Sequence, residues 1–107
     1  MSNIIPTYQD HSVFDHVVLF QAQKRNEFLL KNGVDIHQEI LACPVVFEGD
    51  VDGYYLYYHS RGGFWRVEIG KDFEFHGKDT YYGWTPPHIA YLQIWQAVKE
   101  WRKGRSE

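Results

Sequence analysis

The sequence has one cysteine, Cys43, and no long apolar run. A single cysteine cannot form an internal disulfide bond, and it excludes zinc sites built from several cysteines. The longest apolar run, Val17 to Phe20, is far shorter than the roughly 20 residues of a membrane-spanning helix. The N-terminus also lacks the basic and apolar segments of a secretory signal. We therefore expect a soluble, cytoplasmic protein with no membrane partner.

Basic residues are outnumbered by acidic ones. The chain has 11 lysines and arginines against 14 aspartates and glutamates, which gives a net charge of −3. Domains that bind nucleic acid usually need a basic surface, so we expect no nucleic-acid partner. The cations near the C-terminus are typical of the last turn of a helix, where positive charge complements the helix dipole. These cations are Lys99, Arg102, Lys103 and Arg105.

The usual catalytic and metal-binding motifs are missing. The chain has no GxSxG elbow and no phosphate-binding loop, and we expect Cys43, in an apolar segment, to be a buried small hydrophobic side chain. The six histidines form no HExxH or HxH pair; only His59 and His76 share a predicted sheet face. We expect no cofactor, no metal and no enzyme activity. Acid–base chemistry among Glu68, Glu74 and His76 is the alternative.

Aromatic residues, in contrast, are abundant and clustered. The chain has 4 tryptophans, 8 tyrosines and 7 phenylalanines, and fifteen of them lie between Phe47 and Trp101. Many alternate along predicted strands so that both strand faces carry aromatics. Aromatics on a second face must either bury a second surface or present one, which makes that face the main clue to function.

Two helices are predicted to flank this region. Residues 12–32 form an amphipathic pattern that starts at Ser12 and stops at Gly33, although residues 16–22 could instead be a strand. Residues 36–41 suggest a short helical turn before Pro44. The second helix is expected to be capped by Thr85 and to run to about Lys103. Its apolar side is expected to consist of Ile89, Leu92, Trp95, Val98 and Trp101.

Three or four strands are predicted between the helices. Their expected ranges are 45–48, for the optional first strand, then 54–59, 64–69 and 73–76, joined by turns at 48–53, 60–63 and 70–72. The 107 residues therefore predict a single α+β domain. It consists of an N-terminal helix, a three- or four-stranded antiparallel β-meander and a C-terminal helix packed on the sheet.

The loop lengths predict which side chains share a face. A four-residue loop at 60–63 pairs Tyr58 with Trp65 and places Tyr57 opposite Arg66, and a three-residue loop at 70–72 pairs Ile69 with Phe73. The inner face is then uniformly apolar: Tyr54, Leu56, Tyr58, Trp65, Val67, Ile69, Phe73 and Phe75. The other face carries Tyr55, Tyr57, His59, Phe64, Arg66, Glu68, Glu74 and His76.

This mixed aromatic and charged face is typical of a binding surface, because interfaces are enriched in tyrosine, phenylalanine and arginine. We expect a small protein-binding module that acts stoichiometrically, such as an inhibitor or a toxin-neutralising immunity-type protein. Acidic side chains would steer a basic partner. The structural alternative is that the N-terminal helix covers this face, or that cross-strand pairs merely stabilise an exposed sheet.

A second aromatic segment offers another functional alternative. Tyr81, Tyr82, Trp84 and His88 lie just before and within the start of the second helix, where they could form a small-molecule pocket. Alternatively, Tyr82 and Trp84 fill the end of the core as the helix docks, and this structural interpretation is the one we favour.

Overall fold

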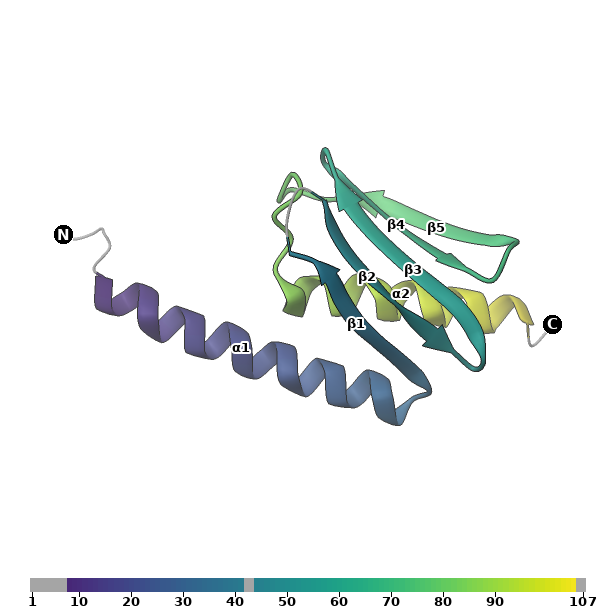
Figure 1. Cartoon of the computed structure of the whole chain (residues 1–107), viewed down its shortest axis with the longest axis horizontal. Coiled ribbons are helices and arrows are strands. Elements are labelled where there is room, and N and C mark those ends of the chain that lie inside the picture. The colour runs from purple at the N-terminus through teal and green to yellow at the C-terminus, as the bar shows by residue number, and fades with distance from the viewer. Residues whose placement is uncertain (1–7, 42–43, 106–107) are drawn as a thin grey trace.

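The computed structural model describes residues 8–41 and 44–105, with side chains from residue 20 onward. Along the chain, an N-terminal helix is followed by five antiparallel strands and a C-terminal helix. The α+β class is thus confirmed, but the predicted strand count of three or four is too low. The strands pair in sequence order, β1-β2-β3-β4-β5 (Figure 1). The elements are α1 (Tyr8–Lys31), β1 (Val34–Ile40), β2 (Val45–Val51), β3 (Tyr54–Arg61), β4 (Phe64–Ile69), β5 (Phe73–Lys78) and α2 (Pro87–Arg105). Cys43 falls outside the described residues.

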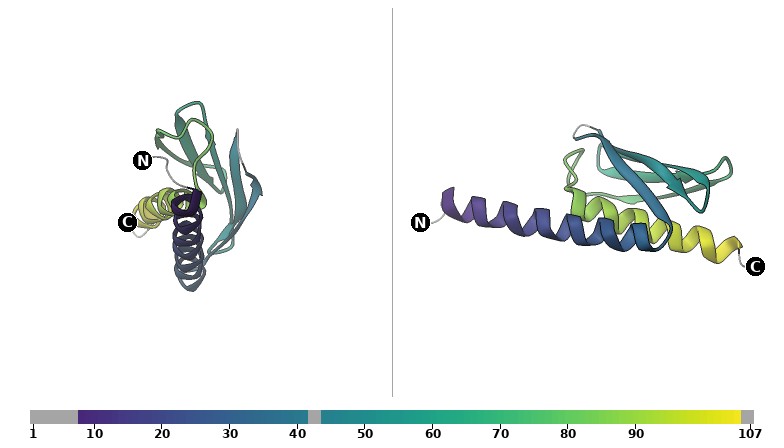
Figure 2. Two further views of the ribbon diagram at one scale, coloured as in Figure 1. Left: turned by 90° about the vertical axis from the view of Figure 1, so that its left-hand side faces the viewer. Right: turned by 60° about the horizontal axis from the view of Figure 1, so that its bottom comes forward.

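Both helices lie on the same side of the sheet (Figure 2). The C-terminal half of α1 runs alongside α2 in the same direction: Arg25 Nη1 donates to the His88 carbonyl oxygen at 2.5 Å, and the rings of Phe28 and Trp95 meet edge to face at 5.0 Å. The N-terminal half of α1 extends beyond the rest of the protein. In the described residues α1 therefore does not cover the second sheet face, so that structural alternative is wrong.

The first helix starts earlier than predicted, and the next element differs in type. α1 is helical throughout residues 16–22 and begins at Tyr8, ahead of Ser12. Residues 34–40 form strand β1, not a helical turn, because Val34 and Ile36 are buried while Asp35 and His37 are exposed. This two-residue alternation is the period of a strand.

The hairpins are tighter than expected. The β3–β4 turn contains only Gly62 and Gly63, both at positive φ, which is typical of a two-residue hairpin turn. Tyr58 therefore pairs with Val67 and not with Trp65, and Tyr57 pairs with Glu68 and not with Arg66. The predicted register is wrong by two residues, and a slip of two preserves the faces. The β4–β5 pairing agrees with the prediction, since Ile69 pairs with Phe73.

The β2–β3 turn is also short. Strand β2 continues to Val51, so most of the predicted turn at 48–53 is strand, and only Asp52 and Gly53 form the turn. Arg102 holds this turn against the end of α2: its Nη2 lies 2.8 Å from Asp52 Oδ1 and also donates to the Asn32 carbonyl oxygen at 2.6 Å. Hydrogen bonding to Arg102 lowers the pKa of Asp52. One arginine thus joins the ends of both helices to the sheet.

The core lies between the sheet and α2. Inner-face residues such as Leu56, Tyr58 and Val67 are completely buried, as predicted. The helix face differs from the prediction, because Leu92 is exposed, whereas Trp95 packs on α1. The buried side of α2 consists of Ala90, Ile94, Ala97, Val98 and Trp101. Within the described residues, neither helix is long and apolar enough to cross a membrane.

Candidate binding face

The sheet face turned away from the helices is the candidate site, and we call it the open face. All eight predicted binding residues lie on it, because they alternate with the buried inner-face residues along β3, β4 and β5. Tyr55 and Phe64 are more than half exposed, at 53% and 58%. Tyr57, His59, Arg66 and Glu68 are partly exposed, and Glu74 and His76 are exposed. The open face therefore presents both aromatic and charged groups to solvent.

Cross-strand pairing arranges the open face into four rows. The first is Asp35, Asp50 and Tyr55; the second is His37, Glu48, Tyr57, Glu68 and Glu74; the third is Ile40, Val46, His59, Arg66 and His76; the fourth is Arg61, Phe64 and Lys78. The five carboxylates in these rows are all in the first two, and a sixth, Glu39 at the irregularity of β1, forms an ion pair with His37 of the second row. The two arginines and the lysine are in the last two. We call these halves the acidic end and the basic end of the open face.

Tyrosines occupy the centre of the acidic end. The Tyr55 hydroxyl donates to Glu48 Oε1 at 2.5 Å, and this bond to a carboxylate raises the pKa of Tyr55 to about 12. The Tyr57 ring stacks on His59 with ring centres 6.2 Å apart and planes at 16°. The stack fixes an aromatic surface across the boundary between the two ends. Neighbouring aromatic rings held in this way lose little side-chain freedom on binding.

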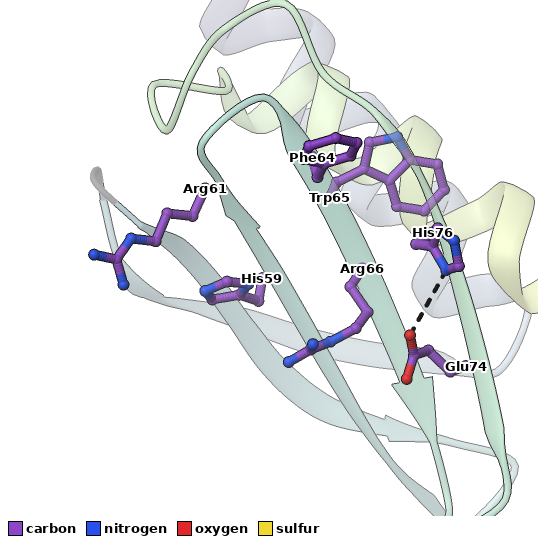
Figure 3. Close-up of a pocket in the computed structure, with 7 residues that line it drawn as sticks. All are labelled: His59, Arg61, Phe64, Trp65, Arg66, Glu74 and His76. Carbon is purple, nitrogen blue, oxygen red and sulfur yellow. Dashed lines mark ion pairs between the residues drawn. The ribbon is translucent and has the colours of Figure 1, made fainter.

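The basic end surrounds a shallow pocket of about 360 Å³. Figure 3 shows its lining side chains, which are His59, Arg61, Phe64, Trp65, Arg66, Glu74 and His76. Arg66 Nε lies 3.0 Å from Glu68 Oε2, and His76 Nδ1 lies 3.6 Å from Glu74 Oε2. Burial lowers the pKa of His59, and the charges of Arg66 and Arg61 lower it further. The pocket thus contains two arginines and two histidines, and the paired residues Glu68 and Glu74 lie in the neighbouring row.

Trp65 reaches the pocket from the covered side of the sheet because its partner on β5 is Gly77. A Cβ atom at residue 77 would lie only 2.8 Å from the Trp65 indole nitrogen. The indole therefore occupies the space that any other residue at position 77 would fill. This packing fixes the rim of the pocket at the edge of the sheet.

The aromatic loop before α2 does not fill the core. Tyr82 and Trp84 are 70% and 67% exposed, so the structural interpretation we favoured is wrong. Trp84 N donates to the Tyr81 carbonyl oxygen, and Tyr82 and Gly83 both have positive φ, at 52° and 93°. A tyrosine in this conformation is strained, and such strain is found most often at functional sites.

His88 is separated from the exposed aromatics by its position in the first turn of α2. It is partly buried, its Nδ1 has no hydrogen-bond partner among the described residues, and burial followed by the charge of Arg25 lowers its pKa. The four residues predicted for a ligand pocket therefore divide into three exposed loop aromatics and one partly buried histidine.

A buried polar cluster holds this loop under the sheet. The Ser60 and Thr85 hydroxyls both donate to Asp79 Oδ2, at 2.8 and 2.6 Å, and all three residues are at least 96% buried. The Asp79 backbone N–H donates to the Gly63 carbonyl oxygen at 2.7 Å. Thr85, predicted as the helix cap, instead fixes the loop to β3, and α2 begins at Pro87. These bonds set the position of the loop beside the β3–β4 turn.

Several open-face residues were not predicted because the predicted strands end too early. His37 was expected in a helical turn, Asp50 and Arg61 in loops, and Asp35 in no element, but all four lie in strands. The adjacent glycines at 62–63, which fit a two-residue turn, were the available signal. Without these residues, the separation of charge along the face could not be recognised.

Neither a search for metal-binding groups nor comparison with known proteins indicates a function. In residues 8–41 and 44–105, no group of three or more histidine, cysteine or acidic side chains is placed to hold a metal ion. His59 and His76 flank Arg66 in the same row. Comparison of the chain with protein-family models, with curated proteins and with solved structures gave no match.

Proposed function

We propose that this protein is a small binding module that holds a protein partner stoichiometrically on the open face, as an inhibitor or an immunity-type protein does. The observation that carries the proposal is that both helices lie on one side of the sheet, while the opposite side presents Tyr55, Tyr57, Phe64 and Arg66. Aromatic and arginine side chains are the most frequent anchors of protein interfaces.

The chemistry of the open face favours a protein partner. Two of its tyrosines are already held, Tyr55 by Glu48 and Tyr57 by His59, so that little ordering remains to be done on binding. The carboxylates of the acidic end would attract a basic region of the partner and speed association. Exposed aromatics surrounded by charges contribute little to folding and much to recognition.

The test combines an affinity pull-down from the native cell with quantitative binding of the recovered partner. Tyr57→Ala and Arg66→Ala should each weaken binding by roughly 1–3 kcal/mol, as central anchors do. Both side chains are partly exposed, so the thermal midpoint should hardly change. Unchanged affinity in both variants would reject the proposal, and a large loss of stability would show that these side chains serve the fold.

A second candidate function is supported by the aromatic loop. Tyr81, Tyr82 and Trp84 are exposed on a turn with a strained tyrosine, which is compatible with binding a small aromatic or apolar ligand. Tyr82→Ala is therefore a matched control for Tyr57→Ala. If the loop variant weakens binding of the recovered molecule while the sheet variant does not, the loop is the site.

A further inference from the structure

The basic end of the open face has cationic groups that the fold does not use. The side chain of Arg61 makes no hydrogen bond or ion pair with another described residue, and neither does the side chain of Lys78. Arg66 pairs with Glu68 through Nε, and its two Nη groups make no hydrogen bond within residues 8–41 and 44–105. Donors of this kind are available to an external anion.

Two of these cations, Arg61 and Arg66, line the same pocket. Arg61 and Arg66 lie on neighbouring strands as diagonal neighbours, because Arg61 pairs with Phe64, two residues before Arg66. Side chains so related start about 7–8 Å apart, a distance that two long guanidinium side chains can bridge. In Figure 3 the His59 ring lies between them, and Phe64 and Trp65 form an apolar rim. An arginine pair beside aromatic groups suits a carboxylate carried on a peptide.

The acidic end limits what the occupant can be. Glu68 and Glu74 lie in the next row, where alternate strand residues are about 7 Å apart along the backbone, and the Glu68 carboxylate reaches Arg66 Nε at 3.0 Å. Both distances are shorter than the Debye length in physiological salt, so the repeated phosphates of a nucleic acid would be repelled. A folded protein can instead place acidic groups at the basic end and basic groups at the acidic end.

We propose that the basic end binds an acidic segment of the partner protein, with one carboxylate held between Arg61 and Arg66 in the pocket. The proposal rests on the proposed function and makes it more specific. The partner then presents a surface of two charges, acidic over the pocket and basic over the carboxylates of Glu48, Glu68 and Glu74. Electrostatic complementarity along the strands would also fix the orientation of the partner on the sheet.

The test uses end-blocked hexaglutamate as a probe, with hexalysine as its control, in an NMR titration of the whole protein. Hexaglutamate should shift the backbone amides of residues 59–66 and 76–78, and high salt should abolish the effect. The double variant Arg61→Ala/Arg66→Ala should weaken binding at least about fivefold. Lys71→Ala, which removes an exposed cation in the turn at the acidic end, should leave binding unchanged.

Three outcomes would overturn the inference. Amide shifts over the whole surface, or hexaglutamate binding that Lys71→Ala weakens as much as the double arginine variant does, would indicate nonspecific attraction. Hexathymidine could bind the same residues more tightly, which would assign the pocket to phosphate. A dimer that is lost in the double arginine variant, seen by sedimentation, would assign the acidic groups to a second copy of this chain.

Failure of this inference can be distinguished from failure of the proposed function. The hexaglutamate titration needs no native partner, whereas the proposed function requires a partner whose binding weakens with Tyr57→Ala. Partner binding that requires Tyr57 but not Arg61 or Arg66 would overturn only this inference. Specific hexaglutamate binding without any partner that depends on the open face would overturn only the proposed function.

Discussion

The covered and open faces of the sheet are built from alternate residues of the same strands, yet they differ in almost every property. On β4, Val67 is completely buried under α2, and its neighbour Glu68 is partly exposed on the other side. The covered face is apolar apart from Gln38, Ser60 and the phenol of Tyr58. The open face combines tyrosine and phenylalanine with carboxylates, arginines and histidines.

The two faces also differ in what satisfies their polar groups, which is protein hydrogen bonds on the covered face and also water on the open face. On the covered side the Ser60 hydroxyl donates to Asp79 Oδ2 and the Tyr58 hydroxyl donates to Gln93 Oε1, because an unpaired buried polar group is costly. On the open side Arg61 and Lys78 need no partner, since water solvates them. Exposed aromatics such as Phe64 stabilise the fold little, and in the proposed function they serve recognition.

The largest expected effect comes from adding one methyl group to the covered side of β2. A Cβ atom at residue 49 would lie 1.9 Å from the Asp35 carbonyl oxygen and 2.6 Å from Ile36 Cα, so the backbone of β1 would have to move. Gly49→Ala should therefore cost roughly 3 kcal/mol of unfolding free energy. Denaturant unfolding measures it.

Gly104→Ala is the matched control for this change. No atom lies within 4 Å of its added Cβ, and residue 104 is within α2, so the variant should be neutral or gain about 0.5–1 kcal/mol. Equal stability of the two variants would show that β1 does not lie so close to β2.

The next prediction compares the two faces at adjacent positions. Val67→Ala should lower the unfolding free energy by roughly 1–3 kcal/mol, because it leaves a cavity under α2. Glu68→Ala should change it by less than about 0.5 kcal/mol, since only an exposed ion pair with Arg66 is lost. Denaturant midpoints in the opposite order would mean that the faces are exchanged.

The sequence predicts the faces better than the pairings. Alternation alone separates Leu56 and Val67 from Tyr57 and Glu68, and a register error of two residues leaves this separation intact. The strand bounds were harder, because Arg61, Asp50 and Asp35 are polar residues that resemble loop residues in isolation. They are strand residues because they pair across turns, Arg61 with Phe64, Asp50 with Tyr55 and Asp35 with Asp50, and the side chains alone do not indicate this pairing.

The position of α1 and the exposure of the aromatic loop could not be predicted for a similar reason. Arg25 and Phe28 contact α2 more than sixty residues later, and no local pattern specifies which helix or face they meet. Tyr82 and Trp84 resemble core residues by composition. Their exposure follows from the bonds of Ser60, Asp79 and Thr85, which orient the loop from beneath.

The smallest expected effect concerns His59, which reports the charge of the basic end. Its pKa lies below the ordinary value of 6.5, because of burial first and then the charges of Arg66 and Arg61. Since the folded pKa is below that of the unfolded chain, the stability linked to His59 is complete above about pH 6.5. It is lost as pH falls through the folded pKa. NMR titration of the His59 ring protons measures this value directly.

Arg66→Ala should raise the pKa of His59 toward its ordinary value, and Lys71→Ala should leave it unchanged. Hexaglutamate bound in the pocket should also raise it, because a nearby carboxylate favours the protonated ring. A His59 pKa that does not respond to Arg66→Ala would mean that the charge of Arg66 does not lower it. The separation of acidic and basic side chains along the open face would then have no measurable effect on the electrostatic potential at the pocket.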